Sequence, residues 1–186
     1  MSLSGLPVVI VLAAGRGERF AASGGQLHKL QALLAGKRVL DHVLDAVQAS
    51  GLMHHVVQAD ASRPGMGDSI AAGVRATADA TGWLVLPADL PLVQATTLRA
   101  VAHALAQHAV VVPMFKGARG HPVGFSAACR DALLDLKGNH GAAGVVHTHA
   151  AINSVAYLDV TDEGIVTDID TLDDLRRAEA LFKPAQ

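Results

Sequence analysis

Residues 6–17 read LPVVIVLAAGRG, a short apolar run that leads into a glycine-rich turn. The run over residues 6–13 is rich in β-branched side chains and has no polar alternation, which is typical of a strand covered on both faces in a parallel sheet. Gly15 and Gly17 make the turn flexible and leave its backbone amides open. Because ligands of open α/β sheets bind beyond the carboxyl ends of the strands, this turn is the first place to expect a binding site.

Short apolar strands alternate with amphipathic helices along the rest of the chain. This alternation predicts an α/β fold with crossover connections and a mostly parallel sheet, formed by a single domain over residues 1–186. Residues 63–67 are expected to form a loop, after which Asp68 or Ser69 caps a helix. The other expected strands lie at 55–59, 83–86, 109–112, 123–125 and 152–158, and the other expected helices at 39–49, 96–107, 126–136, 142–149 and 172–182.

Composition excludes several classes of protein. The chain has 186 residues, of which 51% are hydrophobic and 17% charged, with a net charge of −2, so it can bury a core and has no basic excess for binding nucleic acid. A single cysteine, Cys129, cannot form an internal disulfide or a cysteine zinc cluster. No apolar run approaches the roughly 20 residues that a membrane span needs. Residues 1–5 do not resemble a signal peptide, so we expect a cytoplasmic protein.

The glycine-rich turn has the features of a phosphate-binding loop. Arg16, Arg19 and Lys29 can supply positive charge beside the open amides. The turn is not a dinucleotide fingerprint, because Phe20 stands where the third glycine should be, and it is not a Walker A loop, because no Gly-Lys-Ser/Thr follows. The alternative is a turn that needs glycine for geometry alone.

Carboxylates in two further loops are candidate metal ligands. Asp89 lies between two prolines in the loop 87–91, directly after a buried strand, and Mg²⁺ prefers one or two carboxylates together with substrate phosphates. The alternative for Asp89 is a cap of the following turn. Asp168 is a candidate second ligand. Asp170 or Thr171 is explained by its position alone as the N-cap of the last helix.

Five short motifs in order carry a family resemblance. They are Leu12-Ala13-Ala14-Gly15 with Arg19 and a downstream lysine, Gly65-Met66-Gly67 with Ser69, Pro87-Ala88-Asp89-Leu90-Pro91, Arg119-Gly120-His121-Pro122, and Asp168-Ile169-Asp170-Thr171 with Asp173-Asp174-Leu175. Together they resemble the molybdenum cofactor nucleotidyltransferases over nearly the whole chain. The similarity is greatest to the molybdopterin cytidylyltransferase branch.

The resemblance implies a Rossmann-like, three-layer nucleotidyltransferase fold. It also implies roles for individual residues. Asp89, Lys29 and Arg19 would be catalytic, and Asp89 would hold Mg²⁺ with Asp168 or Asp170. The nucleotide would be bound by Leu12, Ala13, Ala14, Gly15, Arg16, Gly17, Lys29, Gly65 and Ser69. The second substrate would be bound by Arg119, Gly120, His121 and Pro122.

The implied reaction transfers CMP from CTP to the phosphate of the molybdenum–pterin cofactor and releases pyrophosphate. The guanylyl branch reads Leu-Ala-Gly-Gly at the first motif, so Ala14 favours CTP. The chain departs from the family at the enlarged loop 20–29, in lacking about one βα unit near 60–65, and at 138–143, which has neither the usual acid nor the usual arginine. Three alternatives therefore stay open: a GTP-using enzyme, a nucleotidyltransferase with a sugar phosphate acceptor, and a non-catalytic carrier of the cofactor for a molybdenum hydroxylase.

Overall fold

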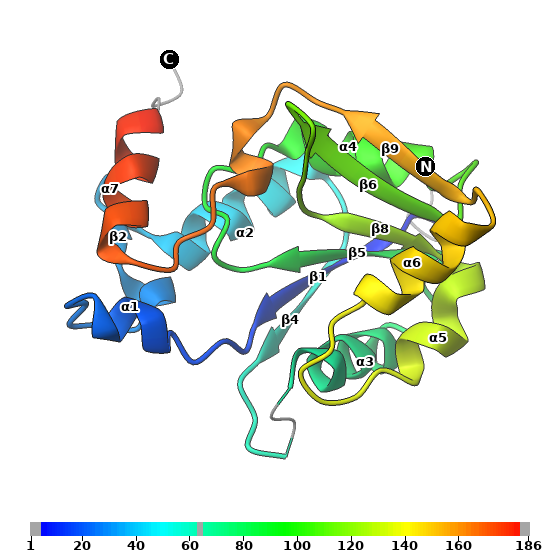
Figure 1. Cartoon of the computed structure of the whole chain (residues 1–186), viewed down its shortest axis with the longest axis horizontal. Helices are drawn as coiled ribbons and strands as arrows, with labels where there is room; N and C mark the ends of the chain where they lie inside the picture. Colours follow the sequence, from blue (N-terminus) through cyan, green and yellow to red (C-terminus); the bar gives the residue numbers. More distant parts are fainter. Residues whose placement is uncertain (1–4, 63–64, 183–186) are drawn as a thin grey trace.

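The computed structural model of the protein describes residues 5–62 and 65–182, and a seven-stranded sheet runs through its centre (Figure 1). The strands follow the order β4-β1-β5-β8-β6-β7, and β9 pairs with the other edge of β6. Their bounds are β1 Val8–Ala13, β4 His54–Gln58, β5 Gly82–Pro87, β6 Val110–Phe115, β7 Ala118–Arg119, β8 Val123–Ser126 and β9 Val155–Asp159.

Most of the sheet is parallel, as the sequence predicts. The strand β1 pairs in parallel with β4 and β5, and β6 pairs in parallel with β9. The exceptions are the short β7, which runs antiparallel to β6, and β8, which runs antiparallel between β5 and β6. Its reversed direction matters for the site, because the register Val85↔Val123 brings the start of β8 to the edge where the parallel strands end.

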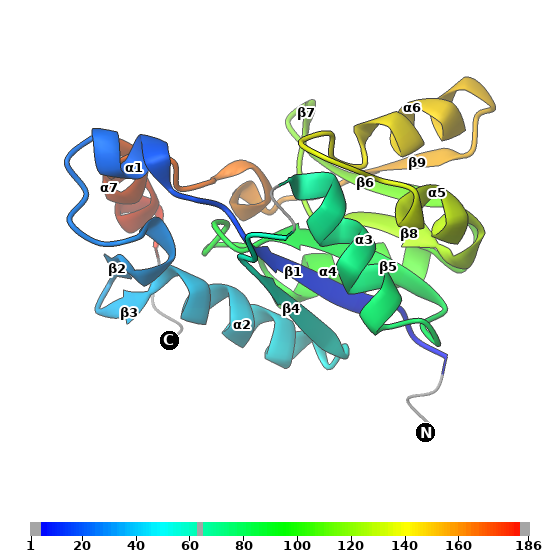
Figure 2. The ribbon, with the colours of Figure 1, turned by 90° about the horizontal axis from the view of Figure 1, so that it is seen from below.

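Helices cover both faces of the sheet and make a three-layer molecule (Figure 2). One face carries α2 (Val39–Ser50) and α4 (Ala95–Ala104), and the other carries α3 (Met66–Ala76), α5 (Arg130–Leu134) and α6 (Ala143–Ala151). At one end, α7 (Leu172–Leu181) lies beside α1 (Glu18–Ala22) and the β2–β3 hairpin (Leu33–Leu34, Lys37–Arg38). Three single-turn 3₁₀ helices complete the fold: η1 (Lys29–Gln31), η2 (Ala127–Cys129) and η3 (Glu163–Val166).

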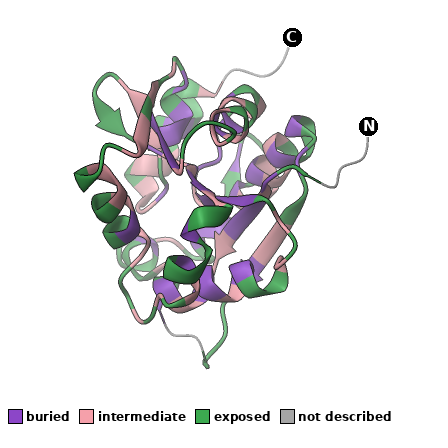
Figure 3. Ribbon diagram, turned by 90° about the vertical axis from the view of Figure 1, so that its right-hand side faces the viewer, coloured by how far each residue is buried: buried purple, intermediate pink, exposed green. Residues whose placement is uncertain are grey.

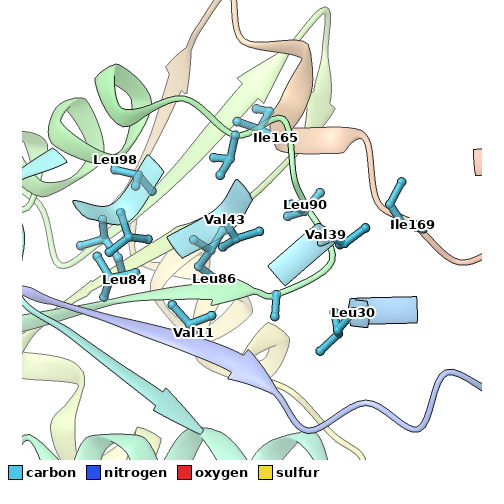
Figure 4. Close-up of a cluster of buried hydrophobic side chains, with 14 of the residues drawn as sticks. Val11, Leu30, Val39, Val43, Leu84, Leu86, Leu90, Leu98, Ile165 and Ile169 are labelled. Atoms are coloured by element: carbon cyan, nitrogen blue, oxygen red, sulfur yellow. The ribbon is translucent and has the colours of Figure 1, made fainter. Parts of the chain in front are cut away.

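Alternate residues of the central strands fill two separate cores. In β1, Val9 and Val11 face the α2 and α4 layer, whereas Ile10 faces α3. In β5, Leu84 and Leu86 join the first core, part of which Figure 4 shows. The strands are therefore buried on both faces and the outer faces of the helices are exposed (Figure 3), which is why the sequence of β1 shows no polar alternation.

The expected start of the third helix was wrong. The helix α3 begins at Met66 with Gly65 as its N-cap, so Asp68 and Ser69 lie inside its first turns. The serine hydroxyl donates to the Gly65 carbonyl, 3.1 Å away, instead of capping amide groups. Of the expected loop at 63–67, residues 63 and 64 lie outside the described part of the chain. The described residues of the connection between β4 and α3 form no further helix or extended strand, in line with the expected short connection.

Over residues 5–62 and 65–182, no helix is both long enough and apolar enough to cross a bilayer.

Candidate active site

A cavity of about 960 Å³ opens at the carboxyl ends of the parallel strands. Its walls come from the loops after β1 and β5, the start of α3, the β7 strand, and the segment that runs from η3 towards α7. Most of the candidate residues from five distant motifs meet there. Those that line the cavity are Leu12, Ala14, Gly15, Arg16, Gly17, Arg19, Lys29, Gly65, Ser69, Asp89, Arg119, His121, Asp168 and Asp170.

Three candidate residues do not line the cavity. Ala13 is the last residue of β1, and its methyl group packs against the first core. Gly120 is packed so tightly that a Cβ atom would lie 2.5 Å from the Ile165 side chain. Pro122 is buried where the chain enters β8. These residues shape the walls and do not present groups to a ligand.

The floor of the cavity is an ion-pair network centred on Lys29. Its Nζ lies 2.6 Å from Oδ2 of Asp89 and 2.8 Å from Oδ1 of Asp170. The other oxygen of Asp170 lies 2.7 Å from Nη1 of Arg19, whose side chain is 78% exposed. Burial works to lower the pKa of Lys29, but the attraction and hydrogen bonds of the two aspartates outweigh it and raise the pKa above its ordinary value. The lysine is therefore a fixed positive charge at neutral pH.

The loop that holds Asp89 and the segment 168–170 are joined by a backbone hydrogen bond. The N–H of Ile169 donates to the carbonyl oxygen of Asp89, at 2.9 Å. Asp168, in the second of these segments, is exposed to the cavity. Its pKa is raised by partial burial and by the negative charges of Asp170, Asp89 and Asp174. In the described part of the chain, no three His, Cys, Asp or Glu side chains are grouped so that they could hold a metal ion by themselves. Between Asp89 and Asp170, the lysine ammonium supplies the cation.

His28 shapes the glycine-rich turn, and the sequence analysis missed it. Its Nδ1 accepts the backbone N–H of Leu30, and its Nε2 lies 2.8 Å from the carbonyl oxygen of Gly15. Both contacts are satisfied together when Nε2 carries the proton. The histidine thus ties the turn to η1 and places Lys29 over the floor. The only signal in the sequence was its position directly before the lysine.

The opposite wall carries Arg119 and His121. The Arg119 guanidinium lies over the Tyr157 ring, 5.3 Å from its centroid, and faces the cavity. Burial lowers the pKa of His121, against the effects of a backbone hydrogen bond and of nearby aspartates, so its ring is neutral at pH 7. Its backbone N–H donates to Ile165 of η3, and its Nδ1 is buried without a hydrogen-bond partner among the described residues.

The third wall was only partly foreseen. Gly65 and Ser69 were candidates, but Met66, Gly138 and Asn139 line the cavity beside them. The segment 138–143 departs from the family pattern in sequence, and the structure places residues 137–141 against the first turn of α3.

Several solved structures share the fold of this chain. A crystal structure of Rv0371c from Mycobacterium tuberculosis H37Rv in complex with manganese matches with a TM-score of 0.71 and 24% identity, covering 95% of this chain and 100% of that one. The molybdopterin-guanine dinucleotide biosynthesis protein A of Archaeoglobus fulgidus matches with a TM-score of 0.61 and 18% identity, covering 94% and 97% of the two chains. At these identities the likeness shows the fold.

Sequence comparison points to the same group of proteins. The chain is 36% identical over 129 residues to the purine catabolism protein PucB of Bacillus subtilis, a match that covers 67% of this chain and 61% of PucB, so it spans less than two thirds of that relative. A model of the MobA-like NTP transferase domain matches residues 9–152. The glycine-rich turn, Lys29, Asp89 and Arg119 all fall within that match, and the chain belongs to the MobA-like NTP transferase family.

Proposed function

We propose that this nucleotidyltransferase transfers CMP from CTP to the phosphate of a molybdopterin-type cofactor and releases pyrophosphate. The observation that carries the proposal is the floor of the cavity, where Lys29 is held between Asp89 and Asp170 directly below the glycine-rich turn. A triphosphate bound along that turn would have its reacting phosphorus between fixed cations and carboxylates.

The nucleotide half of the cavity is suited to a triphosphate. Arg16 and Arg19 are exposed at the turn, and Lys29 is charged below it. Arginine and lysine neutralise phosphate charge, and backbone amides of a glycine-rich turn donate to phosphate oxygens. Ala14 supports CTP over GTP, because the guanylyl branch of the family has a glycine at this place.

The acidic groups fit a divalent cation of the Mg²⁺ type. Asp89 and Asp168 are oxygen donors at the cavity, and an ammonium already lies against Asp89 as a stand-in cation. Partial burial, and after it the negative charges of Asp170, Asp89 and Asp174, raise the pKa of Asp168. Asp170 is engaged on both oxygens by Lys29 and Arg19, so Asp89 and Asp168 are the better pair of ligands. A bound Mg²⁺ would supply Lewis-acid neutralisation of phosphate oxygens.

The chain's own residues do the rest by positioning. The acceptor phosphate attacks the α-phosphorus of CTP in line, one P–O bond forms, and the bond to the β-phosphate bridge breaks as pyrophosphate leaves. A phosphate monoester is already anionic near neutral pH, so no general base is needed. This agrees with the half-buried His121 of the cavity wall, whose ring is kept neutral at pH 7 because burial lowers its pKa. Arg119 lines the cavity and would bind the acceptor phosphate.

Two features support a molybdopterin-type cofactor as the acceptor: membership of the family, and the cavity wall that Arg119 and His121 form. The structural neighbour from Archaeoglobus fulgidus is named for molybdopterin-guanine dinucleotide biosynthesis. A cytoplasmic location and delivery of the product to a molybdenum hydroxylase belong to the same proposal.

The Asp89→Ala variant tests the proposal. With CTP, Mg²⁺ and a molybdopterin source, we expect the wild type to release pyrophosphate and the variant to lose this activity by at least a hundredfold, because one ligand of the cation and one partner of Lys29 are gone. Asp131→Ala, an exposed aspartate of α5, is the matched control and should keep full activity.

Each alternative has its own outcome in this assay. Pyrophosphate release with GTP only would overturn the nucleotide, and release with a sugar phosphate only would overturn the acceptor. Binding of the pterin without any pyrophosphate release would favour a carrier. Undiminished release by Asp89→Ala would remove Asp89 from the mechanism.

A further inference from the structure

The wall of the cavity beside α3 is made of two chain segments locked together. The N–H of Gly67 donates to the Gly138 carbonyl at 2.8 Å, and the N–H of Gly138 donates to Oδ2 of Asp68 at 3.0 Å. The backbones cross so closely that a Cβ atom on Gly65 would lie 2.0 Å from the carbonyl carbon of Gly138. The glycines of the Gly65-Met66-Gly67 motif are therefore needed for this crossing.

The crossing fixes the position of the next residue, Asn139. Gly138 has a φ of +63°, a left-handed conformation that turns the chain sharply after the docking point. Asn139 follows it and lines the cavity with Gly65, Met66 and Ser69. Its side chain is exposed and has no hydrogen-bond partner among the described residues. A rigid backbone thus presents an unpaired carboxamide to the cavity.

The charge of this wall does not suit phosphate. The cations of the nucleotide half, Arg16, Arg19 and Lys29, come from the turn after β1, from α1 and from η1. The α3 wall has no cation lining the cavity, and Asp68 contributes a negative charge to the first turn of the helix. One N–H group of that turn is already used by Gly138. The exposed thioether of Met66 adds an apolar surface against which an aromatic ring can pack.

We infer that Asn139 is a specificity-determining residue that hydrogen-bonds the base edge of the bound nucleotide. The inference rests on the proposed function and adds to it the wall that reads the base. A carboxamide both donates and accepts, so it matches an edge such as that of cytosine, where an amino donor lies next to a ring acceptor. Leu12 of β1 and Ala14 of the glycine-rich turn line the same cavity, so the base would lie between this turn and the α3 wall.

Equilibrium binding of nucleotides to Asn139→Ala tests the inference without catalysis. Calorimetry in Mg²⁺ buffer compares CTP, GTP, ATP, UTP and inorganic tripolyphosphate, which has no base. We expect the variant to bind CTP about tenfold more weakly, to bind tripolyphosphate within twofold of the wild type, and to lose unequal factors of affinity for the four nucleotides. His140→Ala is the matched control, an exposed neighbour that does not line the cavity, and it should match the wild type throughout.

Other results of the same titrations distinguish a failure of the Asn139 assignment from a failure of the proposed function. Equal losses for all four nucleotides would assign Asn139 to the ribose and overturn the inference, and an equal loss for tripolyphosphate would assign it to the phosphates and overturn it as well. Unchanged CTP binding would remove Asn139 from the site. If the wild type binds neither CTP nor tripolyphosphate, the proposed function itself fails.

Discussion

At the scale of single residues, Lys29 decides the electrostatics of the site. It is buried, and it contacts two carboxylates that would otherwise repel each other across the floor of the cavity. Because its ammonium is close to Asp89, a divalent cation that uses this carboxylate must compete with it. In the proposed mechanism, Lys29 would then turn toward the triphosphate. The same side chain neutralises the two carboxylates in this structure and would become a phosphate ligand when nucleotide is bound.

Replacement of Lys29 separates these two roles. In the Lys29→Met variant we expect Mn²⁺ to bind about tenfold more tightly when no nucleotide is present, because the competing charge is removed. We expect pyrophosphate release to fall at the same time, because the triphosphate loses a cation. Titration of Mn²⁺ followed by electron paramagnetic resonance gives the first quantity.

The exposed Lys37 gives the control for that experiment. It pairs with Asp45 on the surface and does not line the cavity, so Lys37→Met should change neither metal affinity nor turnover. Unchanged Mn²⁺ affinity in Lys29→Met would show that the lysine and the metal do not share Asp89.

At the scale of secondary-structure elements, the start of α7 holds the acidic segment in place. Thr171 is the N-cap and forms a capping box with Asp174, as the position of the threonine in the sequence allows. Burial acts to raise the pKa of Asp174, but hydrogen bonds from Thr171 and Asp170 outweigh it and lower the pKa. The cap also orients the backbone of Asp170, whose N–H lies 3.2 Å from the Asp174 carboxylate.

Removal of this carboxylate should destabilise the protein in a pH-dependent way. We expect Asp174→Ala to lower the free energy of unfolding by about 1 kcal/mol at pH 7. Because the folded-state pKa is below the unfolded value, the contribution is complete above about pH 4 and is lost as the pH falls through the folded-state pKa. Urea unfolding at pH 7 and at pH 3 measures the difference.

The neighbouring Asp173 provides a comparison within the same turn. It is exposed and pairs with Arg176 on the surface, so Asp173→Ala should change stability by less than about 0.5 kcal/mol. An equal loss in both variants would show that the helix responds to charge near its N-terminus and not to the capping box.

The sequence predicted the long elements of the fold and missed several short ones. Strands such as β1 and helices such as α2 were found because their hydrophobic patterns are local, and the family motifs located the turn, Asp89 and the 119–122 loop. The helix α1, the single turn η1 and the crossing of Gly65 with Gly138 were missed. Each is short or is fixed by tertiary contacts, so the sequence contains no hydrophobic periodicity that would predict it.

At the scale of the whole molecule, ligand binding is coupled to global stability. The cavity joins segments from both ends of the chain, so a ligand that fills it stabilises the folded state alone. With Mg²⁺ and CTP at a hundred times the dissociation constant, we expect about 2.7 kcal/mol of added stability, or a rise of about 5–10 °C in Tm.

The single tryptophan reports this transition. Trp83 is fully buried in β5, so its fluorescence follows global unfolding. The Asp89→Ala variant should show no rise in Tm with the same ligands. A wild type whose Tm does not respond to any nucleotide with Mg²⁺ would contradict the proposed function.

The backbone hydrogen bond from Ile169 to the carbonyl oxygen of Asp89 affects how the floor of the cavity is held together. It makes the two acidic loops one unit, although they lie 80 residues apart in sequence. Arg19 of α1 contacts this unit through its solvent-exposed guanidinium, which pairs with Asp170. The floor of the cavity is therefore joined by the backbone itself, whereas its rim is joined by an exposed ion pair.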